Sequence, residues 1–147
     1  ADSRLAQASE QPGIEFVVDG RGDVMAQLHA ITGADDLPTL VFDATGNPAS
    51  MMNSFNLVAQ GGRLVFVSLV QGEITFNDPE FHRRETTLKS SRNATAQDFD
   101  RVLAALAAKS ISVDPWITHH ATPEELLVHF DSWTKPETGV VKAILDF

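Results

Sequence analysis

Three short segments place small and polar residues directly after apolar runs, where they could bind a flat polar ligand. The sequence reads DATG at residues 43–46, VSL at 67–69 and SSRN at 90–93. Small side chains let a ligand approach the backbone, and the N–H and C=O groups at a strand end can hydrogen-bond an amide such as nicotinamide. Arg92 is the only cation in the three segments and could pair with a phosphate or a carboxylate.

Each segment also has a purely structural interpretation. DATG followed by Asn47 and Pro48 is a good strand-to-helix connection, because Asn caps a helix and Pro suits its first turn. VSL can simply end a core strand, and Arg92 can be a solvated surface residue. Ligands of parallel sheets bind outside the carboxyl ends of the strands. The prediction of a binding site therefore depends on the three segments ending at one edge of a sheet.

The sequence offers no recognisable catalytic group or metal site. There are no cysteines, so thiolate zinc ligands and a cysteine nucleophile are excluded. The five histidines are not spaced as metal ligands, neither H-E-x-x-H nor G-x-S-x-G occurs, and we interpret all five as surface or structural residues: His29, His82, His119, His120 and His129. We predict no catalytic residue and no metal ligand in this chain.

Composition narrows the possible partners. The net charge is −9, which argues against binding to nucleic acid or to an anionic membrane surface. No apolar stretch is long enough to cross a bilayer, and residues 1–11 do not read as a signal peptide. We therefore expect a cytoplasmic protein that binds neither membrane nor nucleic acid.

Apolar runs alternate with helical patterns along the chain. We predict strands at residues 14–19, 38–43, 63–69, 86–90, 116–118 and 140–145. Helices are predicted at 23–32 and 47–59, with further helices beginning near Asp78, Thr95 and Thr122. The continuous apolar character of 38–43 is typical of a parallel strand covered on both faces. The pattern predicts an α/β fold, a doubly wound parallel sheet with helices on both faces.

Several motifs, taken in order, resemble a known family. They are SRLA at 3–6, DVMAQLHAITG at 23–33, LVFDATGNPASM at 40–51, LVAQGGRLVFVSL at 57–69, TLKSSRNAT at 87–95, ISVDPWITH at 111–119 and VVKAILDF at 140–147. Together they resemble the C-terminal part of a zinc-type alcohol dehydrogenase of the medium-chain dehydrogenase/reductase family. The branch that acts on polyols and sugar acids is the most similar.

The resemblance implies a partial fold. Members of the family have a zinc-holding catalytic domain and a Rossmann domain for NAD or NADP, and the end of the chain returns to the catalytic domain. Residues 1–147 are then the C-terminal portion of the Rossmann domain, with about 115–147 returning toward the catalytic domain. The first strands, the glycine-rich loop and the zinc ligands would lie outside this chain. We expect the isolated residues to be marginally stable, or stabilised by dimerisation or by an N-terminal fragment.

The resemblance also assigns the site. Asp43 would end the strand that borders the adenosine half of the cofactor, and Lys142 matches a basic position facing the pyrophosphate. Ser68 stands where family members often have Gly, so its side chain could alter the approach of the backbone to the nicotinamide. The implied cofactor-binding residues are Ala44, Thr45, Gly46, Val67, Ser68, Leu69, Ser91, Arg92, Asn93 and Lys142. The segment from Val67 to Phe76 resembles the one through which family members pair sheets across a dimer.

The function implied is oxidation of an alcohol, polyol or sugar acid by NAD or NADP, with zinc held elsewhere in the parent enzyme. This chain alone is expected to be inactive. Two alternatives stay open from the sequence. One is a non-enzymatic Rossmann-like module that binds a nucleotide or forms an oligomer, and the other is part of a zinc-independent quinone reductase.

Overall fold

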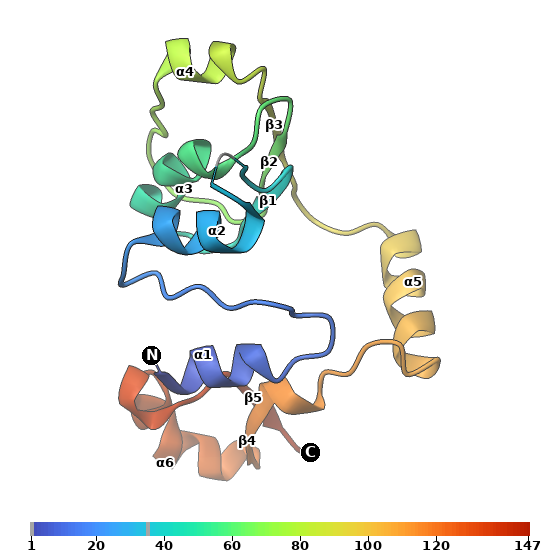
Figure 1. Ribbon diagram of the computed structural model, residues 1–147. Helices are drawn as coiled ribbons and strands as arrows, with labels where there is room; N and C mark the ends of the chain where they lie inside the picture. Colours follow the sequence, from blue (N-terminus) through green and yellow to red (C-terminus); the bar gives the residue numbers. More distant parts are fainter. Residues whose placement is uncertain (1, 35) are drawn as a thin grey trace. The chain divides into compact units, whose positions relative to one another are not determined.

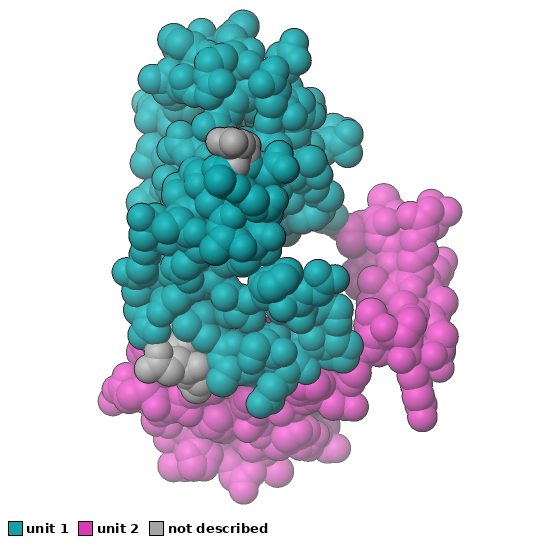
Figure 2. Space-filling model, in the orientation of Figure 1, with its two compact units in different colours: residues 1–93 teal, residues 94–147 magenta. Residues whose placement is uncertain are grey.

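A computed structural model describes residues 2–34 and 36–147 as two compact units. Unit 1 spans residues 1–93 and unit 2 spans residues 94–147 (Figure 2). Among its described residues, unit 1 contains α1 (Asp2–Ser9), three further α-helices and a three-stranded sheet, and unit 2 contains a second, smaller sheet (Figure 1). Within the described residues, no helix has the length and apolar character needed to span a membrane.

The sheet of unit 1 is parallel throughout. It consists of β1 (Leu40–Asp43), β2 (Arg63–Phe66) and β3 (Thr87–Ser90), in the order β1-β2-β3. Chain segments that carry a helix connect each strand to the next parallel strand, as the alternating sequence pattern predicted. The expected parallel α/β arrangement is therefore confirmed.

The helices of unit 1 begin where the capping residues predicted. Asp23 caps α2 (Val24–Thr32), Asn47 caps α3 (Pro48–Ser54), and Asn77 caps α4 (Asp78–Arg83). Each side chain accepts a bond from a backbone N–H of the first turn, which would otherwise lack a partner. The helix expected to reach residue 59 instead ends as a 3-10 turn, η1 (Phe55–Leu57).

The core of unit 1 lies on one face of the sheet. Met51 and Phe55 from the α3–η1 segment pack with Val58 and with Leu64 and Phe66 of β2. Leu64 and Phe66 are two residues apart, so their side chains leave β2 on the same face. Residues of β1 on the other face are far more open, since Leu40 is 47% exposed and Phe42 is 61% exposed.

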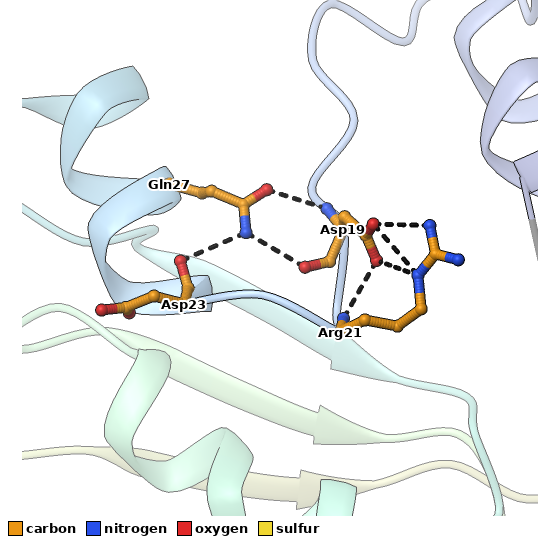
Figure 3. Close-up of polar contacts among 4 residues, drawn as sticks. All are labelled: Asp19, Arg21, Asp23 and Gln27. Atoms are coloured by element: carbon orange, nitrogen blue, oxygen red, sulfur yellow. Dashed lines mark hydrogen bonds and ion pairs between the residues drawn. The ribbon is translucent and has the colours of Figure 1, made fainter.

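The strand predicted at residues 14–19 is absent from the structure, which corrects that expectation. The Gln27 side chain, rather than a neighbouring strand, bonds the backbone of Asp19. Asp19 N–H donates to Gln27 Oε1 at 2.9 Å, and Gln27 Nε2 donates to the Asp19 carbonyl at 3.0 Å (Figure 3). A strand needs a partner in a ladder, and β1, β2 and β3 pair only with one another. An apolar run alone could not supply that partner.

Unit 2 combines helices with a two-stranded parallel sheet. Its elements are α5 (Ala96–Ala107), η2 (Asp114–Trp116), β4 (Ile117–Ala121), α6 (Pro123–Trp133), η3 (Pro136–Thr138) and β5 (Lys142–Leu145). Thr95 and Thr122 form capping boxes with Asp98 and Glu125, which confirms the predicted helix starts. The apolar side of α5 is open in this unit, since Phe99 is 63% exposed and Leu103 is 61% exposed.

Candidate functional site

The ends of β1, β2 and β3 are aligned. Asp43 of β1 is the register partner of Phe66 of β2, and Phe66 is the partner of Ser90 of β3. Parallel strands in register finish at the same edge, so the segments 44–46, 67–69 and 91–93 all begin there. We call this edge, formed by residues 43–46, 66–69 and 90–93, the carboxyl rim. The predicted convergence of the three segments is confirmed, whereas the binding role of each residue stays a prediction.

A buried carboxylate organises the first segment of the carboxyl rim. Asp43 is 4% exposed. Its Oδ1 accepts hydrogen bonds from Thr45 N–H at 3.0 Å and Thr45 Oγ1 at 2.8 Å, and its Oδ2 accepts one from Ser50 Oγ at 2.7 Å. Burial by itself raises the pKa of Asp43, but these hydrogen bonds favour the ionised form and hold the pKa below its ordinary value. The carboxylate therefore stays charged and fixes the DATG turn.

The same carboxylate ends the ladder between β1 and β2. Arg63 N–H donates to the Thr39 carbonyl and Val67 N–H donates to the Asp43 carbonyl, both at 2.9 Å. In this alternating parallel pattern, Thr45 N–H would be the next donor, to the Val67 carbonyl. Thr45 N–H is instead bonded to Asp43 Oδ1. The β1–β2 ladder therefore does not engage the Val67 carbonyl at the carboxyl rim.

Ser68 links the first two segments. Gly46 N–H donates to Ser68 Oγ at 2.9 Å, across 22 positions of sequence. Ser68 Oγ in turn lies 3.5 Å from Asp43 Oδ1, to which it can donate. The side chain that departs from the expected glycine thus contacts the DATG turn directly.

The third segment follows β3. Ser91 N–H donates to the Phe66 carbonyl at 2.9 Å, which extends the β2–β3 pairing by one residue. Asn93 adopts a left-handed backbone with φ of 60°, which turns the chain after the exposed Arg92. Arg92 forms no ion pair with any residue that the structure describes, so its guanidinium can meet an anion. Lys142 is exposed at the start of β5 in unit 2, and its predicted role stays a prediction.

Four of the five histidines have protein partners or aromatic neighbours, and the fifth, His29, lies in α2 and lines a groove described below. His120 Nδ1 lies 3.0 Å from Asp146 Oδ2, and His82 Nε2 lies 3.4 Å from Asp78 Oδ1. The rings of His119 and His129 both pack on Trp133, at centroid distances of 5.4 Å and 5.6 Å. No group of three His, Cys, Asp or Glu residues in 2–34 and 36–147 is arranged to hold a metal ion. The described residues therefore do not fit a zinc site.

A separate groove of about 910 Å³ lies at the amino ends of the strands, away from the carboxyl rim. Its lining includes Thr39 and Gln60, which precede β1 and β2, and Arg83 and Arg84, at the end of α4. The Arg84 guanidinium donates to the Val58 carbonyl at 2.8 Å, and Arg83 pairs with Glu80 at 2.8 Å. Both arginines thus already have partners within the protein. The carboxyl rim is therefore the better candidate for the cofactor site.

Sequence reasoning missed the structural centre of the carboxyl rim. Asp43 was recognised as a strand end but not as a binding partner of Thr45, Ser50 and Ser68. The D-x-T spacing carried a signal, because Asp often accepts a bond from the N–H two residues later. Ser50 had no such local signal, since its bond to Asp43 depends on how α3 packs against β1.

Comparison with known proteins gives relatives that are dehydrogenases by name. L-galactonate-5-dehydrogenase of Escherichia coli K12 is 40% identical over 125 residues, covering 85% of this chain and 36% of that protein. L-threonine 3-dehydrogenase of Bacillus velezensis is 25% identical over 143 residues, covering 95% of this chain and 41% of that protein. The chain thus spans well under half the length of these curated relatives.

Solved structures agree on the fold. A short chain alcohol dehydrogenase from E. coli CFT073, solved with NADH, matches 100% of this chain and 42% of its own with a TM-score of 0.85 at 22% identity. The 2R,3R-butanediol dehydrogenase of Bacillus subtilis gives a TM-score of 0.84 at 21% identity, with the same coverage. These matches support a partial Rossmann fold.

The model of the zinc-binding dehydrogenase family matches residues 1–108, which include α1, the whole β1–β3 sheet and α5. The chain therefore belongs to the zinc-binding dehydrogenase family.

Proposed function

We propose that these residues form part of the NAD(P)-binding domain of an alcohol, polyol or sugar-acid dehydrogenase. The observation that carries the proposal is the alignment of three strand ends at the carboxyl rim. The relative of highest identity named above is an L-galactonate-5-dehydrogenase, which supports a polyhydroxylated acid as the substrate class. The relatives named here are dehydrogenases, so a purely structural or nucleotide-sensing module is not favoured.

The residues present suit part of a dinucleotide. Ala44, Thr45 and Gly46 are exposed and small enough for a nucleoside to lie close to the backbone. The Val67 carbonyl, which the β1–β2 ladder does not use, is an acceptor for a carboxamide N–H₂ group. Arg92 is available for a phosphate. When bound, the nicotinamide would accept hydride from the alcohol, while this chain binds and orients the cofactor.

Zinc would be bound outside these residues. The described part of the chain offers no suitable cluster of ligands, so we assign no step of metal chemistry to it. β4 pairs with β5 in a sheet separate from β1–β3, which supports assigning the two sheets to different domains. We propose that residues 115–147 belong with the catalytic domain of the complete protein.

We also propose a homo-oligomer formed through the segment from Val67 to Phe76. Within this segment Val67, Leu69 and Phe76 are 48%, 77% and 42% exposed. Large apolar side chains open to water favour association with another surface. Sedimentation of the wild type and of Leu69→Asp would test this, with a change from oligomer to monomer as the expected result. A cytoplasmic location remains a prediction.

NADH fluorescence titration provides the test of function. The titration compares the 147-residue chain with a longer protein that carries these residues behind an upstream region, and a steady-state assay of both measures turnover. We expect the longer protein to bind NADH saturably and to oxidise a polyol or sugar acid. We expect no turnover by the chain alone. Turnover by the isolated chain, or absence of NADH binding in the longer protein, would contradict the proposal.

A further inference from the structure

The Ser68 hydroxyl occupies a position between two segments of the carboxyl rim. It accepts the Gly46 N–H at 2.9 Å and lies 3.5 Å from Asp43 Oδ1. Its remaining polar neighbour is Met51 Sδ at 3.9 Å. The hydroxyl therefore acts mainly as an acceptor for Gly46, with its proton directed toward the buried carboxylate.

Gly46 is the residue of the DATG turn that most needs an external restraint. Its φ of 63° lies in the left-handed region, which glycine reaches easily but also leaves easily. Thr45 is held by Asp43, and Asn47 N–H donates to Thr45 Oγ1 at 3.2 Å. Val67 N–H and Ser68 N–H already hold the Asp43 carbonyl, and the bond to Ser68 Oγ is the one that joins Gly46 itself to the segment after β2. A glycine at position 68 could not form it.

We propose that Ser68 is a positioning residue for the cofactor. Its hydroxyl fixes the turn at residues 43–46 to the end of β2, so that the carboxyl rim has its binding shape before the ligand arrives. It also withdraws the Gly46 N–H from the ligand, which leaves the Val67 carbonyl and the third segment to make the polar contacts. This inference rests on the proposed function, because it assigns Ser68 a role in the same site.

A preorganised rim lowers the cost of ordering the loops when the ligand binds. Loss of one such hydrogen bond should weaken NADH binding about three- to tenfold. Because the hydroxyl acts through Gly46 and Asp43, its removal should raise the KM for the cofactor and leave kcat nearly unchanged. A variant that keeps the hydroxyl should retain the wild-type affinity.

The test uses Ser68→Ala, Ser68→Gly and Ser68→Thr in the longer protein, with Ser54→Ala as the matched control. Ser54 is a buried serine, but its hydroxyl donates to the Met51 carbonyl at 2.7 Å, within α3 and outside the carboxyl rim. NADH affinity is measured by fluorescence, KM and kcat by steady-state kinetics, and the exchange of the Gly46 amide by NMR. We expect weaker NADH binding and faster Gly46 exchange in the Ala and Gly variants, near wild-type behaviour for Ser68→Thr, and little change in NADH affinity for Ser54→Ala.

Three outcomes would overturn the inference while leaving the proposed function intact: wild-type NADH affinity in Ser68→Ala, unchanged Gly46 exchange in that variant, or an equal loss of affinity in Ser54→Ala. A wild-type protein that binds no NADH would overturn the proposed function itself and, with it, the cofactor role of Ser68. In that case the Gly46 exchange rates would still report whether the hydrogen bond holds the turn.

Discussion

Ser50 Oγ donates a 2.7 Å hydrogen bond to Oδ2 of Asp43, which is almost fully buried at the end of β1. The bond joins the last residue of a strand to the first turn of the helix that follows it, because α3 begins at Pro48. The other oxygen of Asp43 faces Thr45 and Ser68. One carboxylate thus connects β1, α3 and the segment after β2.

Replacing Asp43 with Asn should lower the free energy of unfolding by about 1–3 kcal/mol, because the neutral amide keeps only one of the two carboxylate oxygens as an acceptor. Either Thr45, which bonds Oδ1, or Ser50, which bonds Oδ2, would lose its charged acceptor in a buried place. Urea denaturation measures the change. The exposed Asp100, in α5, provides the control, and Asp100→Asn should change stability by less than about 0.5 kcal/mol. Equal effects of the two substitutions would contradict this role of Asp43.

The free energy of unfolding should also fall as the pH is lowered, because Asp43 then becomes protonated. Burial raises its pKa, but the hydrogen bonds outweigh burial and the folded-state pKa lies below the ordinary 3.8. A group with a depressed folded-state pKa stabilises the protein above its unfolded-state pKa, and that stability is lost as the pH falls through the folded-state value. Urea midpoints measured from pH 6 downward should therefore decline below about pH 4, and the decline should be shallower in Asp43→Asn. Parallel curves for the two proteins would exclude Asp43 as the cause.

A second acidic group should titrate unusually low for a different reason. The Arg21 side chain bonds Asp19, with Nη2 at 2.6 Å from Oδ2, and together with a bond from the Arg21 N–H it lowers the pKa of Asp19 from 3.8 to about 2 (Figure 3). NMR titration of the Asp19 carboxyl carbon should give that value. In Arg21→Gln the pKa should return toward 3.8. An unchanged pKa in this variant would mean that the ion pair does not form in solution.

The parts of the fold that local chemistry determines could be predicted from sequence. Asn47, Thr95 and Thr122 cap helices within the next three residues, so their signals are contained in a few neighbouring positions. The aligned strand ends followed from alternating strands and helices, because parallel strands place their carboxyl ends at one edge. Those predictions required no knowledge of distant contacts.

The parts that depend on distant partners could not be predicted. The run at residues 14–19 has a strand-like composition, but no strand of unit 1 pairs with it, and Gln27 bonds Asp19 instead. The second strand ends at Phe66 rather than Leu69, because Thr45 N–H bonds Asp43 Oδ1 and the β1–β2 ladder does not continue to the Val67 carbonyl. Ser68 was recognised as an unusual residue, yet its partner Gly46 is 22 positions away.

Two adjacent glycines before β2 should respond very differently to alanine. Gly61 has a φ of 69° and no atom within 4 Å of an added Cβ, so Gly61→Ala should cost only the backbone strain of about 1–2 kcal/mol. At Gly62 the added Cβ would lie 2.6 Å from Val58 Cγ1, 2.8 Å from the Ala59 carbonyl oxygen and 3.0 Å from the Thr39 carbonyl oxygen. The Thr39 carbonyl accepts the ladder bond from Arg63, so it cannot move away without weakening the β1–β2 pairing. Gly62→Ala should therefore cost about 3 kcal/mol or more, at the upper end of overpacking effects. Urea denaturation of both variants measures the difference in the free energy of unfolding. A larger loss in Gly61→Ala than in Gly62→Ala would contradict the prediction, because backbone strain would then matter more than close packing around Gly62.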